Sequence, residues 1–150
     1  MISFEVQDAE LQRVLRRVLS SVENPQPLLH DIGQILKEST MRRFETSTAP
    51  DGARWAKNAE STMRRYRGKL KKPLIGETGN GGLGFTIDYQ PSDDSVSVGS
   101  IKPYAAMQHF GGKKSQFKNL WGDIPARPFL GISDSDRGSI LATVAAFLSP

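Results

Sequence analysis

Hydrophobic residues recur at helical spacing in three parts of the chain. In residues 11–22 the apolar side chains fall every three or four positions, and Asp8, a residue type that caps helix N-termini, precedes them. A second pattern of this kind runs over residues 28–44 after two prolines. A third covers residues 140–148 behind a Ser-x-x-Asp sequence at 133–136. The spacing predicts three amphipathic helices, the first and third with side-chain caps.

Alternation of apolar and polar residues, which is typical of half-buried strands, occurs near both the start and the middle of the chain. Residues 2–6 alternate and predict a short first strand. Residues 85–89 alternate as well, and Val96 and Val98 resume the pattern after the turn-rich stretch 90–94, which predicts a β-hairpin. Together the elements predict an α+β fold, in which amphipathic helices pack on one face of a small antiparallel sheet with a hairpin.

A chain of 150 residues favours a single domain with one core. Residues 56–84 contain few apolar side chains, so we expect a helical fragment that leads into a mobile basic loop at about 63–84. Cysteine is absent, which excludes disulfides, thiolate catalysis and cysteine-based zinc sites. No signal-peptide pattern or membrane-length apolar run is present, so the sequence predicts a cytoplasmic location and no membrane contact.

Residues 79–84, GNGGLG, match the glycine pattern of dinucleotide-binding loops. That site requires a buried strand before the glycines and a helix after them, whose N-terminus faces the phosphates. Here a charged loop precedes the glycines and a predicted strand follows them. We therefore interpret them as a flexible entry into the hairpin and predict no cofactor.

Candidates for catalysis are few. His30 falls on the polar face of the second predicted helix, and His109 lies in an aromatic segment with no acidic residue to orient it, so a packing or contact role is favoured for His109. The acidic pairs 93–94 and 134/136 fall in a turn and at a helix start, where acids have structural reasons to occur. The sequence predicts neither an enzyme nor a metal site.

Positive charge is concentrated in one stretch of a chain whose net charge is +4. Within residues 64–73 six residues are basic and none is acidic: Arg64, Arg65, Arg67, Lys69, Lys71 and Lys72. These side chains are candidates for contact with DNA or with an acidic protein, and a nucleic-acid-binding accessory protein is the alternative function that they support. A solvated loop without a partner explains the same run.

Aromatic residues in loops and short turns suggest protein contacts, although packing at the margin of a small core explains them equally well. The candidates for a subunit or partner interface come from two segments, YAAMQHFGG at 104–112 and PARPFLG at 125–131, and from the tryptophan before them. They are Trp55, Tyr104, His109, Phe110, Arg127 and Phe129.

Four segments in a fixed order resemble the phage virion morphogenesis family, the tail-completion and head-tail joining proteins of Mu-like and related tailed phages. They are PDGARW at 50–55, ETG at 77–79, VSVGSIKPYAAMQHFGG at 96–112 and IPARPFLGISDSD at 124–136. The chain departs from the family pattern at Gln108-His109-Phe110-Gly111, where the family usually has a sequence closer to HQFG, and in the expanded TGNGGLG.

The resemblance implies a structural protein of the virion neck or tail end, without catalysis, that assembles in the host cytoplasm. It further implies a homo-oligomeric ring, a hexamer, with the tail-tube and neck or connector proteins as partners and a possible contact with DNA in the channel. A ring is physically reasonable, because a head-to-tail interface whose rotation closes produces one.

Overall fold

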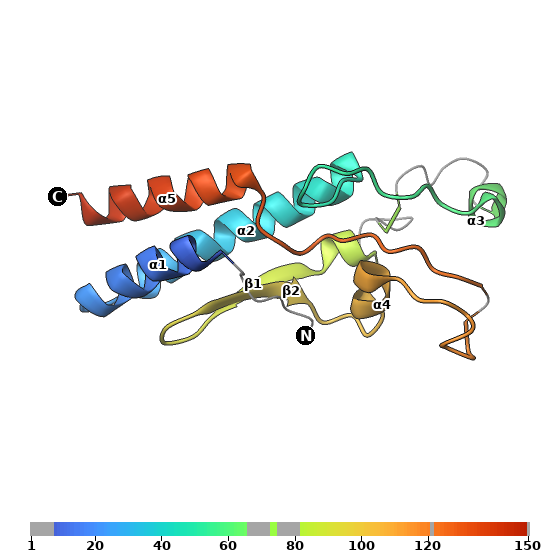
Figure 1. Cartoon of the computed structure of the whole chain (residues 1–150), viewed down its shortest axis with the longest axis horizontal. Coiled ribbons are helices and arrows are strands. Elements are labelled where there is room, and N and C mark those ends of the chain that lie inside the picture. The colour runs from blue at the N-terminus through green and yellow to red at the C-terminus, as the bar shows by residue number, and fades with distance from the viewer. Residues whose placement is uncertain (1–7, 66–72, 75–81, 121, 150) are drawn as a thin grey trace.

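The structure is a computed structural model that describes residues 8–65, 73–74, 82–120 and 122–149. Three long helices, α1 (Ala9–Ser21), α2 (Gln26–Thr46) and α5 (Asp134–Leu148), lie along the long axis of the molecule, and a two-stranded antiparallel hairpin lies against α2 (Figure 1). The predicted α+β class is confirmed. The strand predicted at residues 2–6 lies outside the described residues.

Helix α1 begins where the sequence predicts. Asp8 is its N-cap, and the Asp8 Oδ1 atom accepts a hydrogen bond of 3.0 Å from the Leu11 backbone N–H. The other carboxylate oxygen of Asp8 accepts from Arg137 Nε of α5 at 2.6 Å. The cap residue of the first helix therefore also joins that helix to the last one.

Helix α2 is the central element, since it contacts both strands of the hairpin and α5. Its close approach to the hairpin depends on Gly33, because a Cβ atom at this position would lie 2.3 Å from Cδ2 of Tyr89. Lys37 pairs with Asp88 at 3.3 Å along the same contact. His30, on the exposed side as predicted, lies 3.3 Å from the Tyr89 hydroxyl.

The hairpin consists of β1 (Ile87–Pro91) and β2 (Val96–Ser100), with Tyr89 opposite Val98. The prediction of a hairpin is confirmed, but the prediction that the first strand begins at residue 85 is wrong. Residues Leu83–Phe85 form a 3-10 turn, η1, because Leu83 is buried in the core and Gly84 packs against the Phe44 ring. As predicted, a strand and not an α-helix follows the glycines; residues 79–81 of GNGGLG are outside the described part.

Helix α5 starts with the predicted cap. Ser133 Oγ accepts from the Asp136 N–H, and the Asp136 carboxylate accepts from the Ser133 N–H, both at 3.0 Å, which forms a capping box. From α5, Ile140 and Val144 enter the core that α1, α2 and the hairpin share. None of the described helices has the length and apolar character needed to cross a bilayer.

The end of the molecule opposite the hairpin turn carries short elements and long loops (Figure 1). Helix α3 (Glu60–Arg65) and helix α4 (Ala105–Phe110) lie there, and the predicted turn at Pro50–Gly52 closes a small loop through the Thr48–Arg54 bridge. Gly111 ends α4 with a φ of 73°, and a Cβ there would lie 2.6 Å from the Ala126 backbone nitrogen. This glycine therefore permits the chain after α4 to pass close to residue 126.

Candidate functional site

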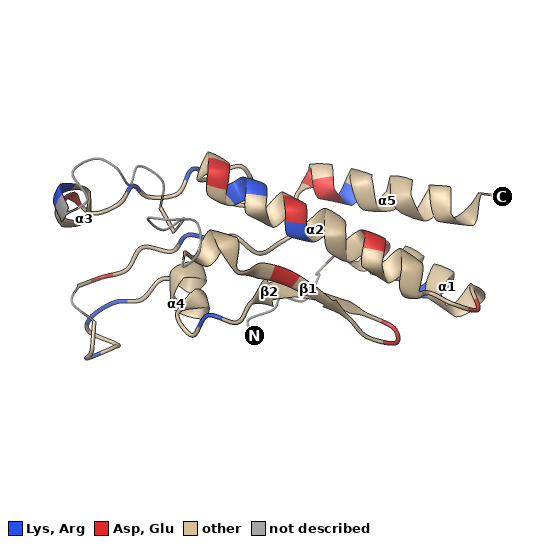
Figure 2. Ribbon diagram, turned by 180° about the vertical axis from the view of Figure 1, so that it is seen from behind, with Lys and Arg blue, Asp and Glu red and all other residues tan. Residues whose placement is uncertain are grey.

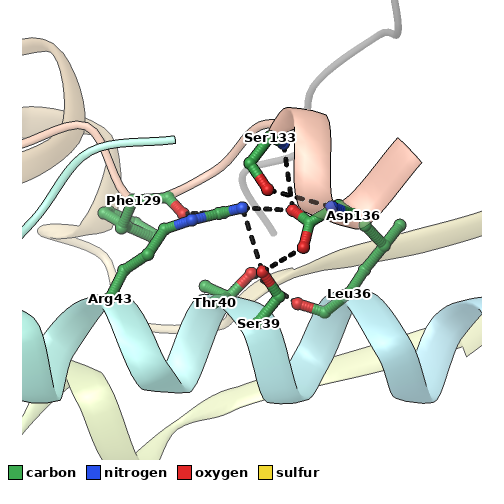
Figure 3. A network of polar contacts seen from close by, with 7 residues as sticks. All are labelled: Leu36, Ser39, Thr40, Arg43, Phe129, Ser133 and Asp136. Carbon is green, nitrogen blue, oxygen red and sulfur yellow. Dashed lines mark hydrogen bonds and ion pairs between the residues drawn. The ribbon is translucent and has the colours of Figure 1, made fainter. Parts of the chain in front are cut away.

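A buried polar network fixes the segment that enters α5 against α2 (Figure 3). The Arg43 guanidinium forms an ion pair with Asp136, and it donates to the Phe129 carbonyl at 2.8 Å and to Ser39 Oγ at 3.1 Å. Both charged side chains are almost fully buried. Burial lowers the pKa of Arg43 from its ordinary value, and the Asp136 carboxylate opposes that shift by favouring the cation.

A second set of contacts fixes the segment just before α5. Arg127 donates from Nε to the Ala56 carbonyl at 2.9 Å and from Nη2 to the Lys57 carbonyl at 2.8 Å. Trp55 donates from Nε1 to the Pro128 carbonyl at 2.7 Å. These side chains connect the loop after α2 to residues 127–129, so their contacts are internal to the chain.

His109 links α4 to the same segment. Its Nδ1 atom is the acceptor for the backbone N–H groups of Phe129 and Leu130, at 3.3 and 3.4 Å, and its ring packs edge-on against Phe129 with centroids 5.2 Å apart. An accepting Nδ1 atom must be unprotonated. Burial lowers the pKa of His109 from its ordinary value, which agrees with this neutral ring.

Acidification is expected to destabilise the fold through His109. The pKa of His109 is lower in the folded chain than in the unfolded chain, so the unfolded chain binds a proton first as the pH falls below about 6.5. The free energy of unfolding therefore decreases until the pH has passed the pKa of the folded chain. Above that range His109 contributes no pH dependence. Urea unfolding of the wild type and of His109→Asn between neutral and mildly acidic pH measures the difference, and parallel curves for the two proteins would contradict it.

The structure divides the six interface candidates into buried and exposed residues. Trp55, Arg127 and Phe129 are buried in the single chain. The sequence predicts that they lie in loops, but their side chains point inward. Trp55 and Phe129 belong to the hydrophobic core, and Trp55 and Arg127 donate hydrogen bonds to backbone carbonyl groups of the loops. His109 is half-buried, while Tyr104 and Phe110 are exposed. We therefore retain Tyr104 and Phe110 as interface candidates.

Four exposed apolar residues lie in α4, just before it or on the loop that follows it, and we call this set the aromatic end. The exposed fractions are 81% for Ile101, 41% for Tyr104, 70% for Phe110 and 45% for Phe117. Sequence reasoning missed Ile101 and Phe117. The available signal was the position of Phe117 in the polar stretch 113–118, which contains three lysines and no other apolar residue.

An arm at residues 111–126 extends from α4, with Trp121 outside the described residues. Backbone hydrogen bonds between Gly112 and Ile124, of 2.9 and 2.7 Å, close its base. Exposed Lys113, Lys114 and Lys118 are close to Phe117 in the sequence of the arm, and the Asp123 carboxylate accepts from the Lys114 N–H at 2.9 Å. The arm thus presents an aromatic side chain among positive charges.

Little of the predicted basic run belongs to the described residues. Arg64 is exposed on α3 and pairs with Glu60 at 3.1 Å, and Arg65 ends that helix. The other four basic residues of the run, Arg67, Lys69, Lys71 and Lys72, lie outside the described part, as does most of the loop predicted to be mobile. Over the described ranges, no group of three or more histidine, aspartate or glutamate side chains is placed to hold a metal ion.

The comparisons with known proteins cover almost the whole chain. The model of the phage virion morphogenesis family matches residues 6–149. Mu-like prophage FluMu G protein 2 of Haemophilus influenzae is 29% identical over 96% of this chain and 94% of its own length. Tail completion protein S of Escherichia phage P2 is 25% identical over 93% of this chain and 97% of its own length.

No solved structure matches the chain at a significant level. The match of the family model extends from before α1 to the end of α5, so it includes the helices, the hairpin, the aromatic end and the buried network together. The chain belongs to the phage virion morphogenesis family.

Proposed function

We propose that this chain is a structural, non-catalytic subunit that completes the phage tail and joins it to the head. In this proposal it forms a homo-oligomeric ring, a hexamer, at the neck or the tail end of the virion, after assembly in the host cytoplasm. Its partners are other copies of itself and the tail-tube and connector proteins.

The match with a tail completion protein supports this role. The relative from Escherichia phage P2 is named for tail completion, and the alignment covers 97% of it, so the likeness extends over nearly the whole of that protein. A protein that completes a tail must bind neighbouring proteins on at least one surface. The aromatic end provides such a surface on the described part of this chain.

The exposed aromatic end is the observation that carries the proposal. Four large apolar residues between 101 and 117 remain in contact with water, although neighbouring residues such as Ala105 are completely buried. Exposed apolar clusters with aromatic members are typical of protein interfaces, because burying them on association is favourable. A second protein surface would remove this area from water.

The alternative of a nucleic-acid-binding accessory protein depends on the basic run. Of the described residues in that run, Arg64 already pairs with Glu60 of its own helix. The family and its relatives are named for morphogenesis and tail completion, which favours the structural role. A salt titration of DNA binding by the purified chain separates the two, because a phosphate-binding protein loses affinity steeply with salt.

Removal of the protein from an infection tests the proposed role directly. With the gene inactivated, we expect filled heads and separate tails to accumulate in electron micrographs, and the wild-type gene supplied in trans should restore joined particles. Infectious particles formed in normal number without the protein would refute the proposal.

Phe110→Ser is expected to lower the yield of joined particles by about tenfold or more, since truncation of an aromatic interface residue commonly costs more than 1 kcal/mol of binding. The free energy of unfolding should change by no more than about 1 kcal/mol, because the side chain is 70% exposed and its ring contacts only that of His109 among the described aromatic residues. Complementation of the inactivated gene measures the yield. Met41→Ser, at an exposed apolar residue of α2, is the matched control and should leave the yield unchanged. Full yield with Phe110→Ser would exclude the aromatic end as the essential surface.

A further inference from the structure

An apolar groove lies at the other end of the molecule from α4. It has a volume of about 580 Å³, and α1, α2 and the hairpin form its walls. Helices α1 and α2 thus leave a space between their apolar faces. The apolar residues that line it are Leu15, Leu19, Leu29, Ile32, Leu36, Val96, Ile132 and Ile140.

The rim of the groove on the hairpin side is acidic. Asp94 lines the groove, Asp93 precedes it in the turn, and both are exposed. Exposed Glu23 lies in the connection from α1 to α2, and Gln26 Nε2 at the end of that connection donates to the Ser92 carbonyl of the same turn at 2.6 Å. No lysine or arginine occurs in residues 88–101. This rim therefore attracts cations.

The arm and the acidic rim lie at opposite ends of the long axis, as Figure 2 shows by the red hairpin turn at one end and the blue residues on the arm at the other. Phe110 at the end of α4 and Phe117 on the arm lie close in the sequence to Lys113 and Lys114, whereas the groove combines apolar walls with Asp93 and Asp94. The two surfaces are complementary in polarity and in charge. Because they occupy different places on the chain, their contact between copies is heterologous and can close into a ring.

We propose that residues 110–117 of one copy dock in the groove of the next copy. This inference rests on the proposed function, because it specifies the self-contact of the proposed ring. The aromatic rings enter the apolar space, and Lys113 and Lys114 lie over Asp93 and Asp94. Arg16 lies on the α1 wall of the groove. Its positive charge repels the lysines and attracts the face of an aromatic ring, so it sets the orientation in which residues 110–117 dock.

Disulfide trapping tests the contact, because the chain has no cysteine of its own. One copy carries Ser95→Cys at the groove and a second carries Ser115→Cys on the arm; both serines are exposed. We expect a cross-link between positions 95 and 115 after mild oxidation, either in the purified full-length chain or in assembled particles. The matched control pairs Ser115→Cys with Ser139→Cys, on the exposed side of α5, and should cross-link about tenfold less.

Charge reversal provides an independent readout. Lys113→Glu with Lys114→Glu, or Asp93→Lys with Asp94→Lys, should each lower the 95–115 cross-link by about tenfold, whereas all four substitutions in one chain should restore it. The proposal is overturned if the 95–115 pair cross-links no more than the control in both preparations, if 115–115 cross-links predominate, or if the fourfold variant is not restored.

The outcomes separate this contact from the proposed function. If the virus needs the protein to join heads and tails but positions 95 and 115 do not cross-link, only the docking proposal fails. If infectious particles form without the protein while the cross-link appears in the purified chain, the proposed function fails and the self-contact stands.

Discussion

Asp136→Ala is expected to lower the free energy of unfolding by about 3–5 kcal/mol, because it leaves the buried Arg43 guanidinium without its carboxylate. The substitution also removes one half of the capping box of α5. Ser133→Ala removes the reciprocal half of the box and leaves the ion pair in place, so it gives the scale of a capping loss, about 1 kcal/mol. The larger part of the loss with Asp136→Ala should therefore come from the unpaired charge and not from the cap.

Urea unfolding followed by tryptophan fluorescence is a suitable measurement, because Trp55, one of the two tryptophans, is buried beside Phe44. The matched control is Arg137→Met, which breaks ion pairs of the same chemistry with Asp8 and Glu10 at partly exposed positions. Because solvent screens these pairs, their loss should cost only about 1 kcal/mol. Equal losses for Asp136→Ala and Arg137→Met would contradict the role of burial in this argument.

A double substitution distinguishes the pair itself from the unpaired charge. Arg43→Met combined with Asp136→Leu removes both buried charges, so it should be less destabilising than the sum of the two single substitutions. Strict additivity would mean that the ion pair contributes no coupling. The ion pair joins α2 to the start of α5, and Arg43 also binds the Phe129 carbonyl. The network therefore holds residues 127–133, which connect the arm to α5.

The helices, their caps and the hairpin could be predicted because each depends on residues close together in the sequence. The apolar spacing of α1, α2 and α5 and the caps at Asp8 and Ser133 are local signals, and the structure confirms them. The partner of Arg43 could not be predicted in this way. Asp136 is 93 positions away, and although Arg43 falls on the apolar stripe of α2, seven residues after Leu36, that position does not identify its partner.

The inward or outward direction of loop aromatics has no local signal either. Trp55 and Phe129 lie in irregular segments, where neither the helical nor the strand period indicates which side faces the core. Phe110 is at the end of a short helix and looks equally suitable for burial from the sequence, yet it is exposed. Contacts with α2 determine the inward orientation of Trp55 and Phe129, since both rings pack against Phe44.

Phe129→Ala is expected to destabilise the fold by about 3–5 kcal/mol, although the sequence suggested Phe129 as an interface residue. The side chain has an exposed fraction of 0% and packs against Phe44 and His109, with ring centroids 5.3 and 5.2 Å apart. The substitution would leave a cavity at the junction of α2, α4 and residues 127–130.

A loss of this size is a large part of the 5–15 kcal/mol that stabilises a typical domain, so Phe129→Ala should unfold at markedly lower urea concentration than the wild type. Phe129→Leu retains most of the apolar volume and should lose less. Phe110→Ser is the paired comparison, because it should keep the stability of the fold while impairing assembly. If Phe129→Ala is as stable as the wild type and only fails to assemble, residue 129 acts on the surface, and the division of aromatic residues between core and interface must be reversed at that position.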